Sequence, residues 1–295
     1  MLPAVTPHVA QRQAINEAVR AEINLCYTCG SCVAECPVNR ATNRLQPRTL
    51  VWMANLGLLD ELVRLPDIWF CILCNRCSHV CPMTVKPSRL IRYLRWEAVH
   101  GGSVASAFPA QWKALYQSFQ DARYAAAALC GEGKGLPADS GELFETRGPA
   151  ANTAPLEVTR GGGGAARRSL ARAVSEYRGY PTHVSSCFAC GECSNACPVA
   201  LNRAAFDPLA IIRSTLVGAE DELLRSPSIW LCIACESCSR TCGMGVKGHF
   251  VMRRLQELSV SEGAVDEKFP LRWQACQRAL YETFVERVVS LRAGL

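Results

Sequence analysis

The sequence predicts an all-α protein built from two tandem domains, which a linker rich in glycine and proline joins. Three observations support this class: a repeat at an offset of 161 residues, apolar residues at helical spacing in both copies, and no sustained alternation of the kind that marks strands. The chain has 295 residues, a comfortable length for two domains. We expect the domains at residues 1–130 and 166–295 and the linker at residues 131–165.

The repeat runs from about residue 26 to about 120 and again from 187 to 281. Trp69 and Trp112 of the first copy, for example, recur as Trp230 and Trp273. Two copies are too few for a solenoid, so two fused domains are the simpler interpretation. Between the copies lie scattered prolines and a run of four glycines, which is typical of a flexible linker.

The helices of the first copy follow from apolar spacing and from proline and glycine. Ala10 to Leu25 has the composition and spacing of a helix that leads into the first cysteine motif. Pro47 suits the first turn of a second helix, and Leu58 to Leu65 suits a short third one. Pro87 opens the next helix, and the last begins near Pro109. The second copy repeats the last two helices, from Val251 to Gly263 and from Pro270 onward.

One cysteine pattern, C-x2-C-x2-C-x3-C, occurs four times and uses sixteen of the 18 cysteines. Three thiolates at two-residue gaps can wrap one iron–sulfur cube, while the fourth, usually followed by proline, ligates the neighbouring cluster of a pair. Four motifs therefore predict four 4Fe–4S clusters in two pairs, in a protein that moves electrons. The motifs consist of Cys26, Cys29, Cys32 and Cys36; Cys71, Cys74, Cys77 and Cys81; Cys187, Cys190, Cys193 and Cys197; and Cys232, Cys235, Cys238 and Cys242.

Zinc and disulfide bonds are the alternatives to iron–sulfur ligation. A structural zinc site usually brings two separated C-x2-C pairs to one ion, which is not the layout of these motifs. Disulfides need an oxidising compartment, and Met1 to Ala10 does not resemble a signal peptide. The two cysteines outside the motifs, Cys130 and Cys276, are expected to be ordinary buried or free thiols, with Cys276 replacing a core hydrophobe.

The charge balance argues against a nucleic-acid-binding protein once the clusters are counted. The chain has a formal net charge of +6, and four oxidised clusters with their thiolates add about −8. No run of eighteen or more apolar residues predicts a membrane span. We expect a cytoplasmic protein that reaches a membrane only through partners. Because no flavin or nicotinamide fingerprint is present, it also needs partners for catalysis.

In each copy, the interval between its two motifs is 35 residues, longer than in small bacterial ferredoxins. With the residues around it, each copy resembles the C subunit of heterodisulfide reductase, a family with a helical ferredoxin-like fold. The resemblance covers most of both domains but not the linker. This chain departs from the family in carrying two modules and in placing Gly243, not proline, after its last motif. The resemblance is carried by Pro47-Arg48, Leu56-Gly57-Leu58, Asp60-Glu61-Leu62, Asp67-Ile68-Trp69, Cys81-Pro82 and Val85-Lys86, and by Glu222-Leu223-Leu224, Ile229-Trp230-Leu231-Cys232 and Val246-Lys247.

The resemblance implies an electron-transfer subunit with four clusters and no catalytic residues of its own. Its implied partners are a flavin-containing A-like subunit and a cysteine-rich B-like subunit. The iron–sulfur subunit of another dehydrogenase or reductase, quinone-linked or low-potential, and a structural iron–sulfur scaffold are the alternatives. The extra backbone N–H of Gly243 also predicts the highest potential for its cluster. The implied ligand sets are Cys26, Cys29, Cys32 and Cys81; Cys71, Cys74, Cys77 and Cys36; Cys187, Cys190, Cys193 and Cys242; and Cys232, Cys235, Cys238 and Cys197.

Overall fold

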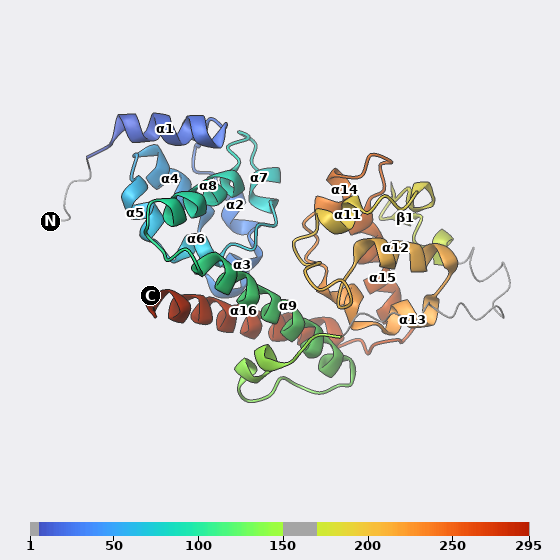
Figure 1. The fold of residues 1–295 in the computed structure, drawn as a ribbon. Helices are drawn as coiled ribbons and strands as arrows, with labels where there is room; N and C mark the ends of the chain where they lie inside the picture. Colours follow the sequence, from blue (N-terminus) through green and yellow to red (C-terminus); the bar gives the residue numbers. More distant parts are fainter. Residues whose placement is uncertain (1–5, 150–169, 295) are drawn as a thin grey trace. The chain divides into compact units, whose positions relative to one another are not determined.

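The computed structural model describes residues 6–149 and 170–294, which are mostly helical with almost no strand (Figure 1). The prediction of an all-α fold is therefore confirmed, while residues 150–165 of the predicted linker lie outside the described residues. The strands of the described part are β1 (Glu176–Tyr177) and β2 (Tyr180–Pro181), an antiparallel pair too short to leave an alternating pattern. Among the described helices, none is both long and apolar enough to cross a membrane.

The first half of the chain confirms most of the predicted helix starts. Pro47 and Pro87 occupy the first turns of α4 and α8, where the missing N–H of proline costs nothing. The helix expected over Ala10 to Leu25 is shorter, because Arg20 adopts a left-handed conformation with φ of 49° and ends α1. The elements are α1 (Val9–Val19), η1 (Ile23–Leu25), α2 (Ser31–Ala34), α3 (Pro37–Thr42), α4 (Pro47–Asn55), α5 (Leu59–Arg64), α6 (Asp67–Phe70), α7 (Arg76–His79), α8 (Pro87–His100), α9 (Phe108–Gly131) and η2 (Ser140–Glu145).

The second half repeats this order after the β1–β2 hairpin. The long helix α16 begins at Phe269, the repeat position of Phe108, where α9 begins. The segment before the fourth motif is the 3-10 helix η4, whereas its counterpart α6 is a short α-helix. The elements are η3 (Val184–Ser186), α11 (Glu192–Asn195), α12 (Pro208–Val217), α13 (Glu220–Arg225), η4 (Pro227–Leu231), α14 (Ser237–Arg240), α15 (Gly248–Ser261) and α16 (Phe269–Ala293).

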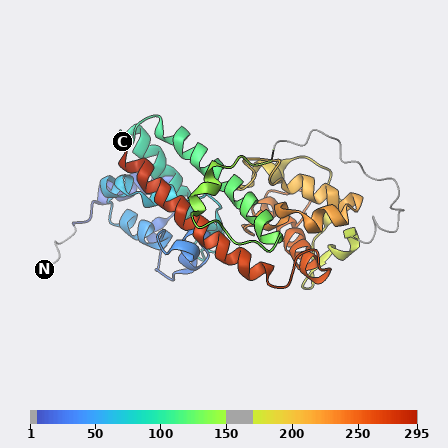
Figure 2. The same ribbon diagram turned by 90° about the horizontal axis from the view of Figure 1, so that it is seen from below.

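The chain divides into two compact units. Unit 1 comprises residues 1–115 and 281–295, and unit 2 comprises residues 116–280. Helix α9 thus begins in unit 1 and ends in unit 2, while α16 does the reverse. In unit 2 the second half of α9 lies beside the first half of α16 (Figure 2), where Arg123 Nη2 donates to Gln277 Oε1 at 3.0 Å. The domain boundaries at residues 130 and 166 stay a prediction.

The same tryptophan contact anchors the last helix of each copy. Trp112 on α9 donates its Nε1–H to the Trp69 carbonyl at 2.7 Å in unit 1. Trp273 on α16 donates to the Trp230 carbonyl at 3.0 Å in unit 2. Trp69, Trp230 and Trp273 are all buried. Because Trp69 and Trp230 stand two residues before a cysteine motif, this contact holds the start of each motif against a long helix.

Candidate metal centres

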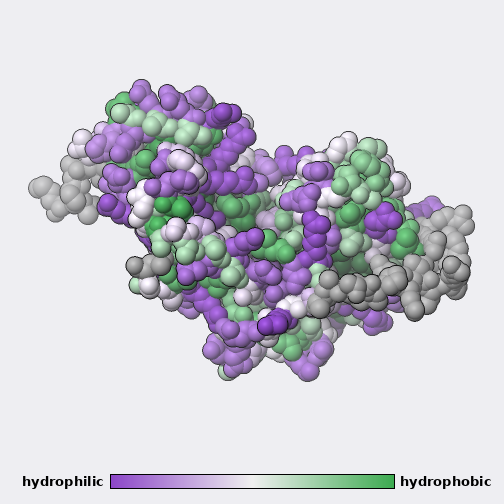
Figure 3. Space-filling model, viewed as in Figure 1, coloured by the Kyte–Doolittle hydropathy of each residue, from purple (hydrophilic) through white to green (hydrophobic). Residues whose placement is uncertain are grey.

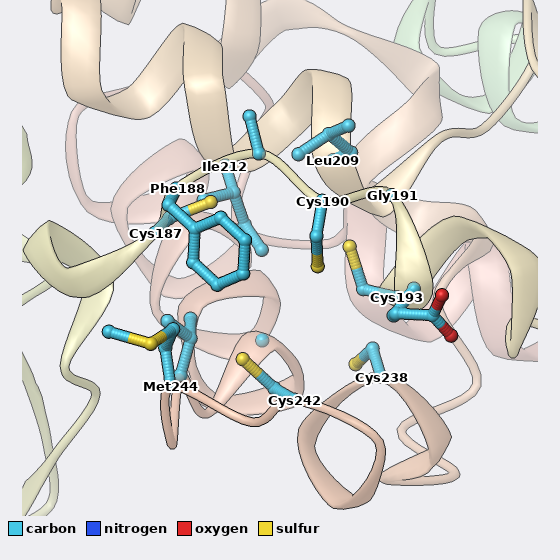
Figure 4. Close-up of a pocket in the computed structure, with 14 residues that line it drawn as sticks. Cys187, Phe188, Cys190, Gly191, Cys193, Leu209, Ile212, Cys238, Cys242 and Met244 are labelled. Carbon is cyan, nitrogen blue, oxygen red and sulfur yellow. The ribbon is translucent and has the colours of Figure 1, made fainter.

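Two surface hollows gather the first three cysteines of the first and third motifs with the last cysteine of the motif that follows, and Cys238 also lines the hollow in unit 2. In unit 1, a hollow of about 360 Å³ is lined by Cys26, Cys29, Cys32 and Cys81, here called outer centre 1. In unit 2, a hollow of about 390 Å³ is lined by Cys187, Cys190, Cys193 and Cys242, here called outer centre 2. Figure 4 shows these four sulfur atoms pointing toward one common space. Cys29 and Cys190 are exposed, so both centres reach the surface.

The remaining cysteine of the first motif lies with those of the second, inside unit 1. Cys36, Cys71, Cys74 and Cys77, here called inner centre 1, are each at most 7% exposed. Burial raises the pKa of Cys36 to about 12, and the neighbouring charge of Cys71 adds to the rise. Burial also raises the pKa of Cys77 far above its usual range, with Cys71 and Cys36 contributing. Because the charge of each cysteine acts on the pKa of others in the set, the four thiols lie close together.

Inner centre 2, in unit 2, repeats the arrangement with Cys197, Cys232, Cys235 and Cys238. Burial raises the pKa of Cys197 to about 12 and that of Cys232 to about 11. The pKa of Cys238 is raised by burial and then by the charges of Cys232, Cys235 and Cys197. Cys238 also lines the hollow of outer centre 2, so the two centres of this unit are immediate neighbours (Figure 4).

All four motifs wrap their centre with the same unusual backbone. In each motif the residue before the second cysteine and the residue after it have positive φ. Left-handed turns in such an alternation aim successive N–H groups into a concavity that suits anions, iron–sulfur clusters included. For a residue with a side chain, this conformation costs roughly 1–2 kcal/mol, so its recurrence points to a shared requirement. The residues are Thr28 and Gly30, Leu73 and Asn75, Ala189 and Gly191, and Ala234 and Glu236.

Backbone N–H groups already point at sulfur in two of these loops. The Leu73 N–H donates to Cys71 Sγ at 3.3 Å, and the Ala234 N–H donates to Cys232 Sγ at 3.4 Å. Both donors are the left-handed residues of their motifs. Hydrogen bonds of this kind stabilise a thiolate and tune the potential of a cluster that it holds.

The distances between the thiol groups favour a 4Fe–4S cluster over a single metal ion. In the described ranges, no three histidine, cysteine or acidic side chains lie close enough to hold one metal ion. Zinc would draw four thiolates to about 2.3 Å from one point. A cube instead binds each thiolate at a different iron, which holds the sulfurs farther apart. Thiols around a hollow, backed by inward N–H groups, therefore fit a 4Fe–4S cluster.

An exposed apolar pair rims each outer centre, and the sequence analysis missed it. Tyr27 is 58% exposed and Met83 36% exposed at outer centre 1. Phe188 is 64% exposed and Met244 47% exposed at outer centre 2. Each residue of one pair is the repeat counterpart of a residue in the other. Figure 3 shows hydrophobic surface over the part of unit 2 around α11 and α14. In the sequence, this pair is indicated only by the aromatic residue that directly follows the first cysteine of each copy, Tyr27 or Phe188.

The two cysteines outside the motifs are neighbours. Cys130 on α9 and Cys276 on α16 are both buried, with their sulfur atoms 2.9 Å apart. The prediction that Cys276 replaces a core hydrophobe is confirmed. Burial and the hydrogen bond to Cys276 raise the pKa of Cys130 to about 12. Since the two residues stand 146 positions apart, no sequence spacing indicates their contact.

Comparison with known proteins agrees with the geometry. The 4Fe-4S dicluster domain family matches residues 22–85 and again residues 183–246, which hold all sixteen motif cysteines. Two dicluster domains account for four 4Fe–4S clusters. The matched domains and the helical fold together indicate an iron–sulfur protein.

The curated relatives are C subunits of archaeal heterodisulfide reductases. The C subunit of the H(2):CoB-CoM heterodisulfide,ferredoxin reductase of Methanothermobacter marburgensis is 35% identical over 88 residues, 30% of this chain and 47% of that protein. The iron-sulfur C 2 subunit of the CoB--CoM heterodisulfide reductase of Methanocaldococcus jannaschii is 35% identical over 98 residues, 33% of this chain and 52% of that protein. A protein of Archaeoglobus profundus that is named for its likeness to the heterodisulfide reductase C subunit is 30% identical over 123 residues, 42% of this chain and 65% of that protein.

In these alignments the chain spans about half the length of the first relatives that it matches. The 4Fe-4S dicluster domain itself occurs twice in this chain. Two parts of the chain, residues 22–85 and 183–246, thus match the 4Fe-4S dicluster domain, and the chain is similar to C subunits of heterodisulfide reductase over part of its length.

Proposed function

We propose that this protein relays electrons as the iron–sulfur subunit of a heterodisulfide-reductase-like complex, between a flavin subunit and a cysteine-rich B-like or other catalytic subunit. The observation that carries the proposal is that each unit pairs an inner centre, buried in unit 1 and half-buried in unit 2, with an outer centre that opens to the surface. A relay needs a shielded site that holds the electron and an exposed site that meets the partner. The names of the relatives, all subunits of redox complexes, support the same role.

The proposed ligands of the clusters are the sixteen motif cysteines, with the fourth cysteine of each motif crossing to the other centre of its unit. The position of Cys81 in the hollow with Cys26, Cys29 and Cys32 supports this crossing. The effect of Cys71 on the pKa of Cys36 supports it at inner centre 1. When bound, each cluster takes up and releases single electrons. The chain supplies thiolates, inward N–H groups, and burial that keeps water from the inner centres.

The rims of the outer centres are the proposed docking points for partner subunits. An exposed aromatic side chain and a methionine beside a redox centre provide apolar area that adapts to another surface. Tyr27 and Met83 would meet one partner, and Phe188 and Met244 another. Two docking points suit a protein that receives electrons from one partner and delivers them to a second.

Anaerobic co-purification followed by reconstitution of electron transfer tests the proposal. We expect flavin and B-like subunits to copurify, and we expect dithionite to bleach the clusters reversibly. Adding the isolated partners should then restore turnover. The variant Phe188→Ser should slow transfer at outer centre 2 without loss of iron, and the same change at an exposed apolar residue away from the hollows, Leu271→Ser, is the matched control.

Two outcomes would redirect the assignment. Copurification with subunits of a quinone-linked dehydrogenase would favour the alternative complex. Clusters that dithionite does not reduce, in a protein that still binds its partners, would favour a structural scaffold and contradict the relay.

A further inference from the structure

A buried arginine stands beside inner centre 1. Arg95 on α8 is 8% exposed, and its Nε donates to the Ile68 carbonyl at 2.8 Å. Its Nη2 also donates to the carbonyl of Cys71, the first cysteine of the second motif. The guanidinium carbon lies 4.3 Å from the ring centroid of Trp112. This arrangement holds a full positive charge against the backbone of a proposed cluster ligand.

The second copy lacks an arginine at this position. Gln256 stands at the repeat position of Arg95, and its Nε2 donates to the Ile229 carbonyl at 2.7 Å. Ile229 is in turn the counterpart of Ile68. The hydrogen bond is therefore kept in unit 2, while the charge at this repeat position is lost.

A different residue restores that charge in unit 2. Arg123 on α9 is fully buried, and its Nη2 donates to the carbonyl of Leu231 at 2.9 Å, directly before Cys232. Its other acceptors are the amide oxygens of Gln120 and Gln277, at 2.8 and 3.0 Å. All of these acceptors are uncharged. Burying a guanidinium among uncharged partners is costly unless a negative group lies nearby.

The exchange is reciprocal between the copies. Residue 284 is the repeat position of Arg123, and it is Phe284, a fully buried residue of unit 1. Unit 1 thus has arginine on α8 and phenylalanine on the long helix α16. Unit 2 has glutamine on α15 and arginine on the long helix α9. Each unit keeps one buried guanidinium beside the first cysteine of its later motif, Cys71 or Cys232, although its position in the repeat differs.

We infer that Arg95 and Arg123 are the charge partners of the two inner clusters, and that each arginine raises the reduction potential of the cluster in its own unit. A 4Fe–4S cluster with four thiolates carries about −2 when oxidised and gains one more negative charge on reduction. A fixed positive charge in a medium of low dielectric constant stabilises the reduced form more than the oxidised form.

Single variants of the reconstituted full-length protein test the role of Arg95. Arg95→Gln introduces the residue that the second copy has at this position. We expect the potential of one cluster in four to fall, with its reduction equilibrium weakened at least tenfold, which corresponds to about 59 mV for a one-electron couple. Arg95→Lys keeps the charge and should keep the potential near its original value. Arg92→Gln, which removes an exposed charge from the same helix, should have a smaller effect.

Relocating the charge gives a second and independent test. In unit 2, Arg123→Gln should lower the potential of inner centre 2, and adding Gln256→Arg should restore it from the position that unit 1 uses. In unit 1, Phe284→Arg should likewise rescue Arg95→Gln. The measurement is an anaerobic redox titration followed by EPR, with iron counted in every variant.

Some results would overturn the inference. One is unchanged midpoint potentials in Arg95→Gln and Arg123→Gln with all clusters present, which would leave the arginines a purely structural role. Another is loss of the inner cluster in Arg95→Gln and Arg95→Lys alike, which would show that the shape of the guanidinium matters and its charge does not.

Discussion

Iron counting in paired cysteine variants tests the crossed ligand sets. Four 4Fe–4S clusters correspond to about sixteen iron and sixteen sulfide per chain. In the structure Cys81 shares a hollow with Cys29, while Cys74 lies with Cys71 and Cys77. Loss of a ligand to alanine is expected to remove its cluster, which costs about four iron. A single variant therefore gives about twelve iron whichever centre it damages, and only pairs of variants identify the centre.

Two double variants separate the crossed arrangement from the uncrossed one. Cys81→Ala with Cys29→Ala removes two ligands of outer centre 1, so about twelve iron should remain. Cys81→Ala with Cys74→Ala removes one ligand from each centre of unit 1, so about eight should remain. If each motif held its own cluster, the two values would be exchanged.

The assay is iron and sulfide determination on protein purified without oxygen, supported by EPR of the reduced clusters. Cys276→Ala is the matched control, because Cys276 is a buried cysteine that lines neither hollow and should leave the iron content unchanged. Exchange of the two double-variant values would refute the ligand sets. About eight iron in the fully loaded unmodified chain would refute the count of four clusters.

Three further predictions concern pH, surface charge and fragments. Burial raises the pKa of Cys36 to about 12, so this thiol must release a proton when iron binds. Reconstitution should then weaken as pH falls and strengthen as pH rises toward that pKa, with proton release measurable in weak buffer. Arg48 lines outer centre 1, and Glu192 lines outer centre 2. Because a positive charge favours the reduced cluster, outer centre 1 should have the higher reduction potential in EPR titrations. Added salt should reduce the difference between the two potentials. Residues 1–130 and 166–295, expressed separately, should each hold about eight iron, with lower thermal stability because residues 281–295 belong to unit 1.

The surface charges bear on the expectation for Gly243. Its N–H is one dipole that proline lacks, and a side chain at this position would meet no atom within 4 Å. Glu192 brings a whole negative charge to the rim of the same centre, where the first copy has the neutral Ser31. A charge at the rim outweighs a single dipole unless solvent screens it. Comparing Gly243→Pro with Glu192→Ser in one titration series decides which residue governs the potential of outer centre 2.

The sequence by itself determined the cofactor, the helical class and most helix starts, because each of these is recorded locally. Three thiolates that wrap one cluster must lie within a few residues of one another, so the motif itself identifies the centre. Pro47 and Pro87 mark helix starts because the geometry of proline acts on its own turn. Because the chain contains the repeat twice, each of these local signals occurs in both copies. Where a single residue overrode the local pattern, as Arg20 did at the end of α1, the prediction was wrong.

Only the tertiary structure decided which centres are buried and what surrounds them. The contact of Cys130 with Cys276 and the donation from Arg123 to Leu231 join residues more than a hundred positions apart. Such pairs have no period or spacing that a sequence displays. The division of α9 and α16 between the two units depends on which apolar faces find partners once the chain has collapsed. A buried arginine can therefore lie on α8 in unit 1 and on α9 in unit 2 and still stand beside the inner centre of its unit, because a charge acts through space rather than along the chain.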